Sequence, residues 1–344
     1  MPHINLALIG FGNVGQALAQ LLIRKQYDLK NQYDISFTVT AIGTGTHGAA
    51  INPDGIDLNQ AVSMIGSKAS LDALSTVPVP TDGLSLIKNC RADVLFENTP
   101  VDYETGQPAL DHLRTALELG MHAITANKGP VVHGFKELST LATSRGRKFY
   151  FESTVMDGAP IFSLFRETLP AANLIGFRGI LNSTTNLILS RMETGEDFDE
   201  AVTYAQSIGI AETDPSGDID GWDAAIKVAA LVNVLMGISL KPADVDRQGI
   251  RAISARDIQQ AKQTGKRWKL VCSARRTGDR VTAKVQPEMV SSDSPLYSVD
   301  GTTSVVQFET DVLGLLSVIE NDPGPETTAY GLLADFINAV TPRQ

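Results

Sequence analysis

A glycine-rich turn near the N-terminus constrains the fold of this chain more than any other feature. The stretch "LALIGFGNVGQALAQLL" sets Gly10, Gly12 and Gly15 in G-x-G-x-x-G spacing, between an apolar run that predicts a strand and a segment that predicts a helix. The first glycine permits a tight turn, the second leaves room for a pyrophosphate, and the third lets helix and strand approach. Free N–H groups at the helix start attract phosphate. The context favours a dinucleotide site over a glycine turn without a ligand.

The segment that follows this turn repeats the alternation of strand and helix. Residues 1–135 contain short apolar runs at 4–10, 37–44, 92–99 and 122–127, separated by segments of helical character. Such alternation predicts a parallel sheet with helices on both faces, which is the α/β arrangement of a Rossmann-type domain.

The character of the sequence changes beyond about residue 150. The segments "RWKLVCSARR" and "DRVTAKVQP" predict two antiparallel strands joined at a turn around Gly278. Several helices are expected between about residue 184 and these strands, so residues 136–324 are expected to form a second domain of α+β class. A final amphipathic helix over 325–344 is expected to join the first domain.

Composition narrows the range of partners. The net charge of −10 argues against nucleic acid or an anionic membrane as the main partner, and no apolar run is long enough to span a bilayer. Cys90 and Cys272 fit no metal-ligand spacing, so we expect reduced thiols in a cytoplasmic protein without a signal peptide.

The end of the second expected strand bears on the choice between NAD and NADP. It reads "AIGTGTHG" over 41–48, with neither a carboxylate to bind a ribose 2′-hydroxyl nor an arginine to bind a 2′-phosphate. Small neutral residues do not repel a phosphate, and Thr44, Thr46 or His47 can donate to one. The sequence therefore slightly favours NADP as the cofactor and does not exclude NAD.

A single lysine within an apolar helical segment is the strongest catalytic signal. In "GIAETDPSGDIDGWDAAIKVAALVNVLMGIS", Lys227 stands one helical turn after Asp223, so the two side chains share a face. Glu212 and Asp218, in the preceding loop, can lie around the same pocket. Such a cluster can bind an amino-acid zwitterion and hold a lysine for proton exchange. The alternative is a surface ion pair on a helix that Asp220 caps.

A second lysine occupies a position typical of ligand sites. Lys128, in "HAITANKGPV", immediately follows an expected strand, at the carboxyl edge where open α/β sheets bind ligands. The alternative is a loop lysine exposed to water.

With these motifs assembled, the chain resembles the homoserine dehydrogenase family nearly end to end. The likeness lies in "GFGNVG", "TANKGPV", "GILNSTTNLIL" and, above all, "AQSIGIAETDPSGDIDGWDAAIKVAAL". The resemblance implies NAD(P)-dependent interconversion of L-aspartate 4-semialdehyde and L-homoserine, within threonine, methionine and isoleucine biosynthesis. It also implies a dinucleotide-binding domain over 1–135, a substrate-binding, catalytic and dimerisation domain over 136–324, and a homodimer.

The resemblance further implies roles for individual residues. Lys227 would donate a proton to the aldehyde oxygen, with Asp223 beside it and Lys128 as a second active-site lysine. The implied substrate-binding residues are Glu212, Asp218 and Thr184. The implied nucleotide-binding residues are Gly10, Gly12, Asn13, Val14, Gly15, Thr44, Thr99, Lys128 and Gly324. A monovalent cation, Na⁺ or K⁺, is implied at Glu152, Val155, Asp157 and Ala159.

Some residues depart from the family pattern. Met156 and Asp157 stand where the family has small residues, and Ser183 stands where it has glycine. These departures leave open a related dehydrogenase that acts on another amino-acid semialdehyde. A non-catalytic nucleotide-binding homologue is a third possibility, which the retained Lys128 and Lys227 oppose.

Overall fold

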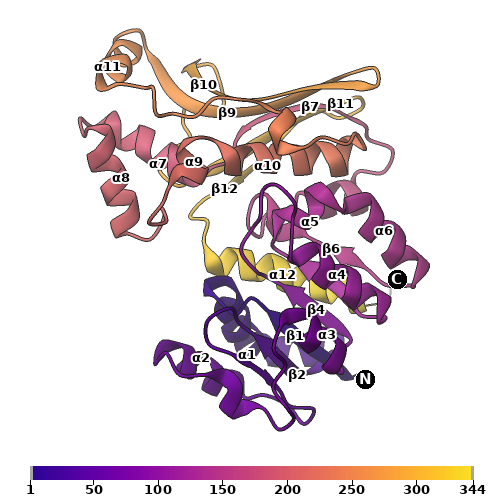
Figure 1. The fold of residues 1–344 in the computed structure, drawn as a ribbon. Helices are drawn as coiled ribbons and strands as arrows, with labels where there is room; N and C mark the ends of the chain where they lie inside the picture. The colour runs from indigo at the N-terminus through magenta and orange to yellow at the C-terminus, as the bar shows by residue number, and fades with distance from the viewer. Residues whose placement is uncertain (1–2, 342–344) are drawn as a thin grey trace. The chain divides into compact units, whose positions relative to one another are not determined.

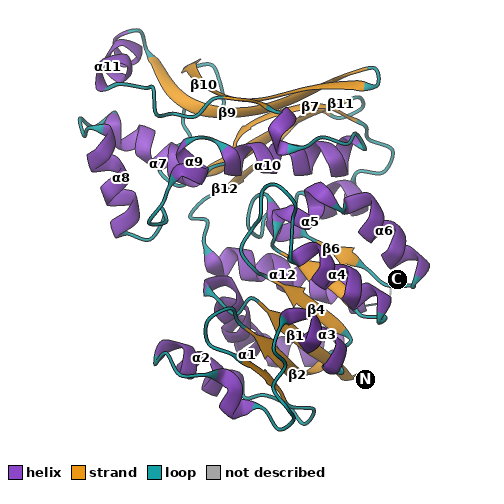
Figure 2. Ribbon diagram, viewed as in Figure 1, coloured by secondary structure: helices purple, strands orange, loops and turns teal. Residues whose placement is uncertain are grey.

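The computed structural model describes residues 3–341, which form two compact units (Figures 1 and 2). One unit comprises residues 3–160 and 324–341, and the other comprises residues 161–323. Residues 136–160 were predicted to lie in the second domain but belong to the first unit. Of the helix expected over 325–344, residues 342–344 lie outside the described part of the chain.

A six-stranded sheet forms the centre of the first unit. Its strands run in the order β3-β2-β1-β4-β5-β6, and all neighbours pair in parallel except β3, which is antiparallel to β2. This order confirms the predicted α/β class. The strands are β1 (His3–Ile9), β2 (Ser36–Gly43), β3 (Ala49–Ile51), β4 (Val94–Glu97), β5 (His122–Thr125) and β6 (Phe149–Tyr150).

Helices cover both faces of this sheet, which explains why β1 is apolar along most of its length. Leu6 and Leu8 pack in one core cluster, and their neighbours Ala7 and Ile9 pack in another on the opposite face. The helices of the unit are α1 (Asn13–Tyr33), α2 (Leu58–Gly66), η1 (Leu71–Leu74), α3 (Gly83–Asn89), α4 (Ala109–Glu118), α5 (Lys128–His133), α6 (Phe135–Ser144), η2 (Glu152–Thr154) and α12 (Pro325–Val340).

Helix α12, the last element of the chain, packs against α1 and η2 of the first unit (yellow in Figure 1). Phe336 of α12 meets Phe96 of β4 edge to face, with 5.9 Å between ring centroids. The buried Asp335 carboxylate accepts a hydrogen bond of 2.7 Å from the backbone N–H of Glu152. The two ends of the chain therefore share one core.

A second six-stranded sheet, in the order β12-β11-β7-β9-β10-β8, organises the other unit. Its pairs are antiparallel except β8, which runs parallel to β10, and the β9–β10 hairpin matches the predicted one. The strands are β7 (Leu174–Ile180), β8 (Asp246–Arg247), β9 (Lys266–Thr277), β10 (Arg280–Ser291), β11 (Ser304–Thr310) and β12 (Gly314–Glu320).

Helix α10 packs against β9 and β10 and is buried apart from the partly exposed Trp222 and Lys227. It continues as the π-helical turn η4 and stops at Gly237, whose φ of 65° favours glycine. No helix in the described part of the chain combines the length and apolar content needed to cross a membrane. The helices are η3 (Leu164–Thr168), α7 (Ser183–Met192), α8 (Phe198–Ser207), α9 (Ser216–Ile219), α10 (Trp222–Leu231), η4 (Val232–Met236), η5 (Pro242–Asp244) and α11 (Ala255–Gln263).

Candidate active site

The glycine turn between β1 and α1 has the shape that a dinucleotide requires. Gly10 has φ +86°, and a Cβ there would collide with the backbone of Asn98. A Cβ at Gly15 would lie 2.5 Å from the carbonyl oxygen of Gly10, whereas a Cβ at Gly12 would meet no atom within 4 Å. Two glycines thus permit close packing, and the third leaves open space at the start of α1. A pyrophosphate fits this space and the free N–H groups of the first helical turn.

A cavity of about 690 Å³ in the first unit adjoins this turn. Gly10 and Thr99 line it, together with residues 43–48 at and after the end of β2 and residues 79–84 before and at the start of α3. Its position at the carboxyl edge of a parallel sheet is where open α/β folds bind ligands. Asn13 and Val14, also expected to contact the nucleotide, begin α1 beside the turn.

Buried polar side chains hold the segments that carry Thr99 and Lys128. Glu97, fully buried at the end of β4, accepts hydrogen bonds from the Thr99 hydroxyl at 2.5 Å and from the Thr99 N–H at 3.3 Å. His112 Nδ1 lies 3.3 Å from the same carboxylate oxygen. Asn127 caps α5, where Lys128 is the first residue, and donates to the carbonyl oxygen of Thr99 at 2.9 Å. Glu97 and Asn127 were not predicted as site residues, although each lies at or just beyond a strand end.

In the second unit, Lys227 lies among polar partners on an otherwise buried helix. Its Nζ is 3.0 Å from Asp223 Oδ2 and donates to the carbonyl oxygen of Leu181 at 2.7 Å. The Lys227 and Asp223 side chains are only 15% and 13% exposed. The ion pair therefore does not belong to an ordinary surface helix, which was the alternative interpretation.

Asn182 joins this ion pair to a second carboxylate. Its Nδ2 donates to Asp218 Oδ1 at 2.6 Å and to Asp223 Oδ2 at 3.0 Å, while its Oδ1 caps α7 through the N–H of Thr185. Burial raises the pKa of Asp218, and the negative charge of Asp223 raises it further. Asn182 was not predicted as a site residue, although it lies in the "GILNSTTN" motif.

The other acids of the segment do not join Asp218 and Asp223. Glu212 is exposed, and within residues 3–341 its carboxylate makes no hydrogen bond or ion pair with this cluster. Asp214 accepts a hydrogen bond from the N–H of Ser216, and Asp220 pairs with Arg251 at 3.1 Å. Thr184, predicted to line the pocket, donates to the carbonyl oxygen of Ile210 at 3.2 Å. Two of the five acids therefore converge on Lys227.

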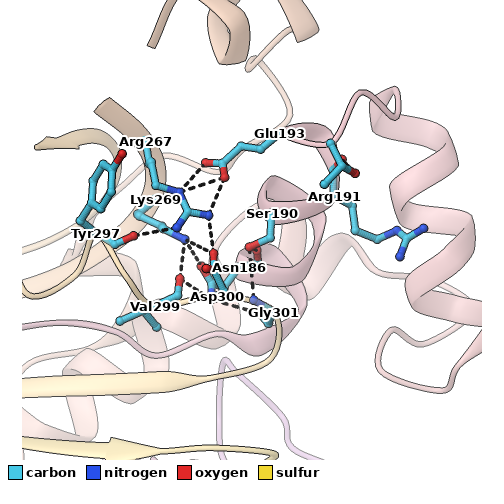
Figure 3. Close-up of polar contacts among 11 residues, drawn as sticks. Asn186, Ser190, Arg191, Glu193, Arg267, Lys269, Tyr297, Val299, Asp300 and Gly301 are labelled. Carbon is cyan, nitrogen blue, oxygen red and sulfur yellow. Dashed lines mark hydrogen bonds and ion pairs between the residues drawn. The ribbon is translucent and has the colours of Figure 1, made fainter. Parts of the chain in front are cut away.

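A second polar network, centred on the fully buried Lys269 of β9, holds the same helix α7 (Figure 3). Lys269 Nζ donates to Asn186 Oδ1 at 3.0 Å and to the carbonyl oxygen of Val299 at 2.5 Å. Asn186 Nδ2 donates in turn to the carbonyl oxygen of Gly301 at 3.0 Å. Burial lowers the pKa of Lys269 to about 8, and the positive charge of Arg267 adds to the effect. Since Asn186 lies one turn after Asn182, this network fixes the helix whose start contacts Asp218 and Asp223.

The expected cation-binding residues lie together beside α12. Glu152 and Val155 are buried, and Ala159 donates its N–H to the carbonyl oxygen of Met156 at 2.8 Å. Asp157 has a φ of +38° and accepts a hydrogen bond from Thr327 at 3.2 Å. Among the described residues no group of three or more His, Cys, Asp or Glu side chains could hold a metal. A site here would therefore depend on backbone carbonyls.

Gly324, expected to contact the nucleotide, precedes α12. Its N–H donates to the hydroxyl of Thr327 at 2.9 Å, and its carbonyl oxygen accepts from the N–H of Thr328 at 3.0 Å. The residue therefore closes the first turn of the helix.

The glycine turn and its cavity, at the carboxyl edge of a parallel sheet, are those of the Rossmann class of dinucleotide-binding proteins. The model of the homoserine dehydrogenase NAD-binding domain matches residues 10–152, and the homoserine dehydrogenase model matches residues 160–337. The chain belongs to the homoserine dehydrogenase family.

Individual relatives match over nearly the whole chain. It is 37% identical over 339 residues to the NAD(+)-dependent homoserine dehydrogenase of Pseudomonas canavaninivorans, covering 98% of this chain and 96% of that protein. It is 38% identical over 336 residues to the homoserine dehydrogenase of Methanocaldococcus jannaschii, covering 97% and 98%. Among solved structures, a hyperthermophilic archaeal homoserine dehydrogenase mutant in complex with NADPH matches with a TM-score of 0.83 at 29% identity, covering 98% of each chain.

Proposed function

We propose that the chain interconverts L-aspartate 4-semialdehyde and L-homoserine, with Lys227 as the group that donates and accepts the proton. The membership of the family supports the reaction. The position of Lys227 supports its role in proton transfer, because its ammonium is largely buried and bound to Asp223 and the Leu181 carbonyl. A bound nicotinamide cofactor supplies or removes the hydride.

In the reducing direction, negative charge develops on the aldehyde oxygen of the substrate. Lys227 stabilises this charge and transfers a proton to the oxygen, a contribution typically of about 10²–10⁴-fold. In the oxidising direction a neutral Lys227 must accept the proton of the alcohol. Oxidation of homoserine should therefore become faster at alkaline pH.

Carboxylates of the second unit provide the recognition of the substrate ammonium. Asp218 and Asp223 converge through Asn182 and are the main candidates, with Thr184 and Glu212 as further substrate-binding residues. Glu212 is exposed, so its role in substrate binding has weaker support than that of Asp218 or Asp223. Lys128 is proposed as a second active-site lysine that contacts substrate or nucleotide.

The first unit is proposed to hold the nucleotide. The open space at Gly12 and the N-terminal turn of α1 suit the pyrophosphate, and the cavity lined by Thr44 and Thr99 suits the remainder of the cofactor. A monovalent cation near 152–159 stays a prediction, as does a cytoplasmic location.

We also propose a homodimer formed through the second unit. On the edge strand β12, Leu315 and Ile319 are 64% and 58% exposed, and their even spacing places them on one face. Leu313, directly before the strand, is 52% exposed. Exposed apolar side chains in such an arrangement mark interfaces.

The decisive experiment follows absorbance at 340 nm with purified protein, homoserine and either NAD or NADP. We expect turnover with homoserine, and we expect Lys227→Met to abolish most of it while the protein still binds nucleotide. Lys241→Met, which removes an exposed lysine of the same unit, serves as the control. Nucleotide binding without turnover on homoserine would show a different substrate or a non-catalytic protein.

A further inference from the structure

The wall of the nucleotide cavity carries negative charge with no lysine or arginine beside it. The residues that line it include two carboxylates, Asp72 and Asp82, and neither lysine nor arginine. Asp72 comes from η1, about thirty residues beyond the end of β2, where an acid that binds the ribose is expected in this fold. The charge of this wall bears directly on the choice between NAD and NADP.

Backbone contacts fix Asp72 beside the loop that follows β2. Leu71 donates its N–H to the carbonyl oxygen of His47 at 2.8 Å, and Asp72 Oδ1 accepts from the N–H of Ala49 at 2.9 Å. Gly48, with φ +73°, makes the approach possible, because a Cβ there would collide with this carboxylate. Within residues 3–341, Asp72 Oδ2 accepts no hydrogen bond, so it is available to a ligand hydroxyl.

The two hydroxyl groups of this loop that could receive a 2′-phosphate, those of Thr44 and Thr46, already make hydrogen bonds within the loop. Thr44 Oγ1 donates to the carbonyl oxygen of Gly48 at 3.0 Å and accepts from the N–H of His47 at 2.7 Å. Thr46 Oγ1 lies 2.8 Å from His47 Nδ1. A 2′-phosphate near this loop would therefore meet the Asp72 carboxylate, and the Thr46–His47 pair would offer it one remaining donor.

Asp82, the other acid of the cavity, is differently bound. Its Oδ1 accepts from the N–H of Ser85 at 2.7 Å, and its Oδ2 accepts from the hydroxyls of Ser85 at 2.8 Å and Thr81 at 3.2 Å. Both oxygens are thus occupied in capping α3. Asp72 is the acid with an oxygen left to bind a ribose.

We propose that Asp72 makes this protein selective for NAD over NADP, by accepting a hydrogen bond from the adenosine ribose and repelling a 2′-phosphate. The inference rests on the proposed nucleotide site in the first unit. This proposal replaces the weak preference for NADP that was predicted from the residues at the end of β2 alone.

Direct binding to the full chain tests the proposal without reference to turnover. Calorimetric titration with NAD, NADP, 5′-AMP and adenosine 2′,5′-bisphosphate measures the effect of one phosphate. We expect wild-type protein to bind NAD at least about tenfold more tightly than NADP, and 5′-AMP more tightly than the bisphosphate. Asp72→Asn, which keeps an acceptor for Ala49, should reduce both preferences about tenfold.

Matched variants separate Asp72 from the general charge of the cavity. Asp72→Glu should keep the preference for NAD, and Asp82→Asn should change it less than Asp72→Asn does. Asp54→Asn removes an exposed acid outside the cavity and should leave all affinities unchanged. Equal binding of NAD and NADP by the wild type, or an unchanged ratio in Asp72→Asn, would overturn the inference alone. Failure to bind any of the four nucleotides would overturn the proposed site as well.

Discussion

The Lys227 ammonium donates a hydrogen bond to the backbone carbonyl oxygen of Leu181, with 2.7 Å between the two atoms. Leu181 directly follows β7 and precedes Asn182, the N-cap of α7. The bond therefore joins the buried helix α10 to the point where a sheet strand gives way to a helix. It holds the lysine in one orientation, which is what proton transfer to a bound substrate requires.

Replacing Lys227 should separate chemistry from nucleotide binding. We expect Lys227→Met to lower kcat by about 10²–10⁴-fold, because the general acid is lost. Affinity for NAD should change less than about twofold, since the glycine turn belongs to the other unit. Stopped-flow absorbance and calorimetry measure the two quantities. A variant with normal kcat and normal folding by circular dichroism would remove Lys227 from the mechanism.

The Asp218 carboxylate should lower the free energy of unfolding while it improves the binding of substrate. Burial and the charge of Asp223 raise its pKa in the folded protein, so the free energy of unfolding falls as pH rises from the unfolded pKa to the folded pKa. Asp218→Asn should therefore raise the free energy of unfolding at pH 7 by about 1 kcal/mol and raise KM for homoserine at least about tenfold. Asp214, whose pKa is lowered by hydrogen bonds from Ser216, provides the contrast. Its change to asparagine should not stabilise the protein.

The buried Lys269 should give the protein a stability that increases at alkaline pH. Because its pKa is about 8 in the folded state and about 10.5 when unfolded, the unfolded chain binds the extra proton between these values. The free energy of unfolding should rise on the order of 2–3 kcal/mol across this window. In Lys269→Met this rise should be absent. Denaturant titrations of both proteins from pH 7 to 10.5 test the difference, with the exposed Lys266→Met as control.

Glu97 should matter for the nucleotide through Thr99. Glu97→Leu leaves the N–H and hydroxyl of Thr99 without their acceptor, so affinity for NAD should fall about tenfold. Glu97→Gln keeps an acceptor of nearly the same shape and should lose less. Calorimetry measures both affinities. Equal losses in the two variants would mean that the negative charge of Glu97, and not its capacity to accept these hydrogen bonds, is what matters.

The apolar face of β12 should control assembly. Leu315→Lys places a charge among the exposed side chains of this strand, so the dissociation constant of the dimer should rise at least about tenfold. Leu119→Lys, at an exposed position of the first unit, should have no such effect. Sedimentation velocity distinguishes the two. A wild-type protein that is monomeric at all concentrations would contradict the proposed interface.

Local periodicity allowed much of the site to be predicted. The glycine turn and the Asp223–Lys227 pair depend on residues within one turn of each other, and helix geometry alone fixes such relationships. The apolar length of α10 likewise indicated that the pair would be buried. These features could be predicted because each depends on residues within one short segment of the chain.

Other site residues depend on contacts between distant segments. Asp72 reaches the cavity only because η1 packs beside the loop after β2, and Asn182 meets Asp218 only because α7 and α9 adjoin. The short β3 and η1 have weak local signals, so they were not predicted. Because β3 and η1 were not predicted, the position of Asp72 in the cavity wall could not be predicted either.

The first unit draws on both ends of the chain, and this has a consequence for biosynthesis. The core around Phe96 lacks Phe336 until translation has passed the whole intervening unit. Residues 161–323 are contiguous and can fold as soon as they leave the ribosome. The nascent N-terminal segment cannot complete its core until helix α12 has been synthesised, and its apolar surface stays accessible to chaperones during that time.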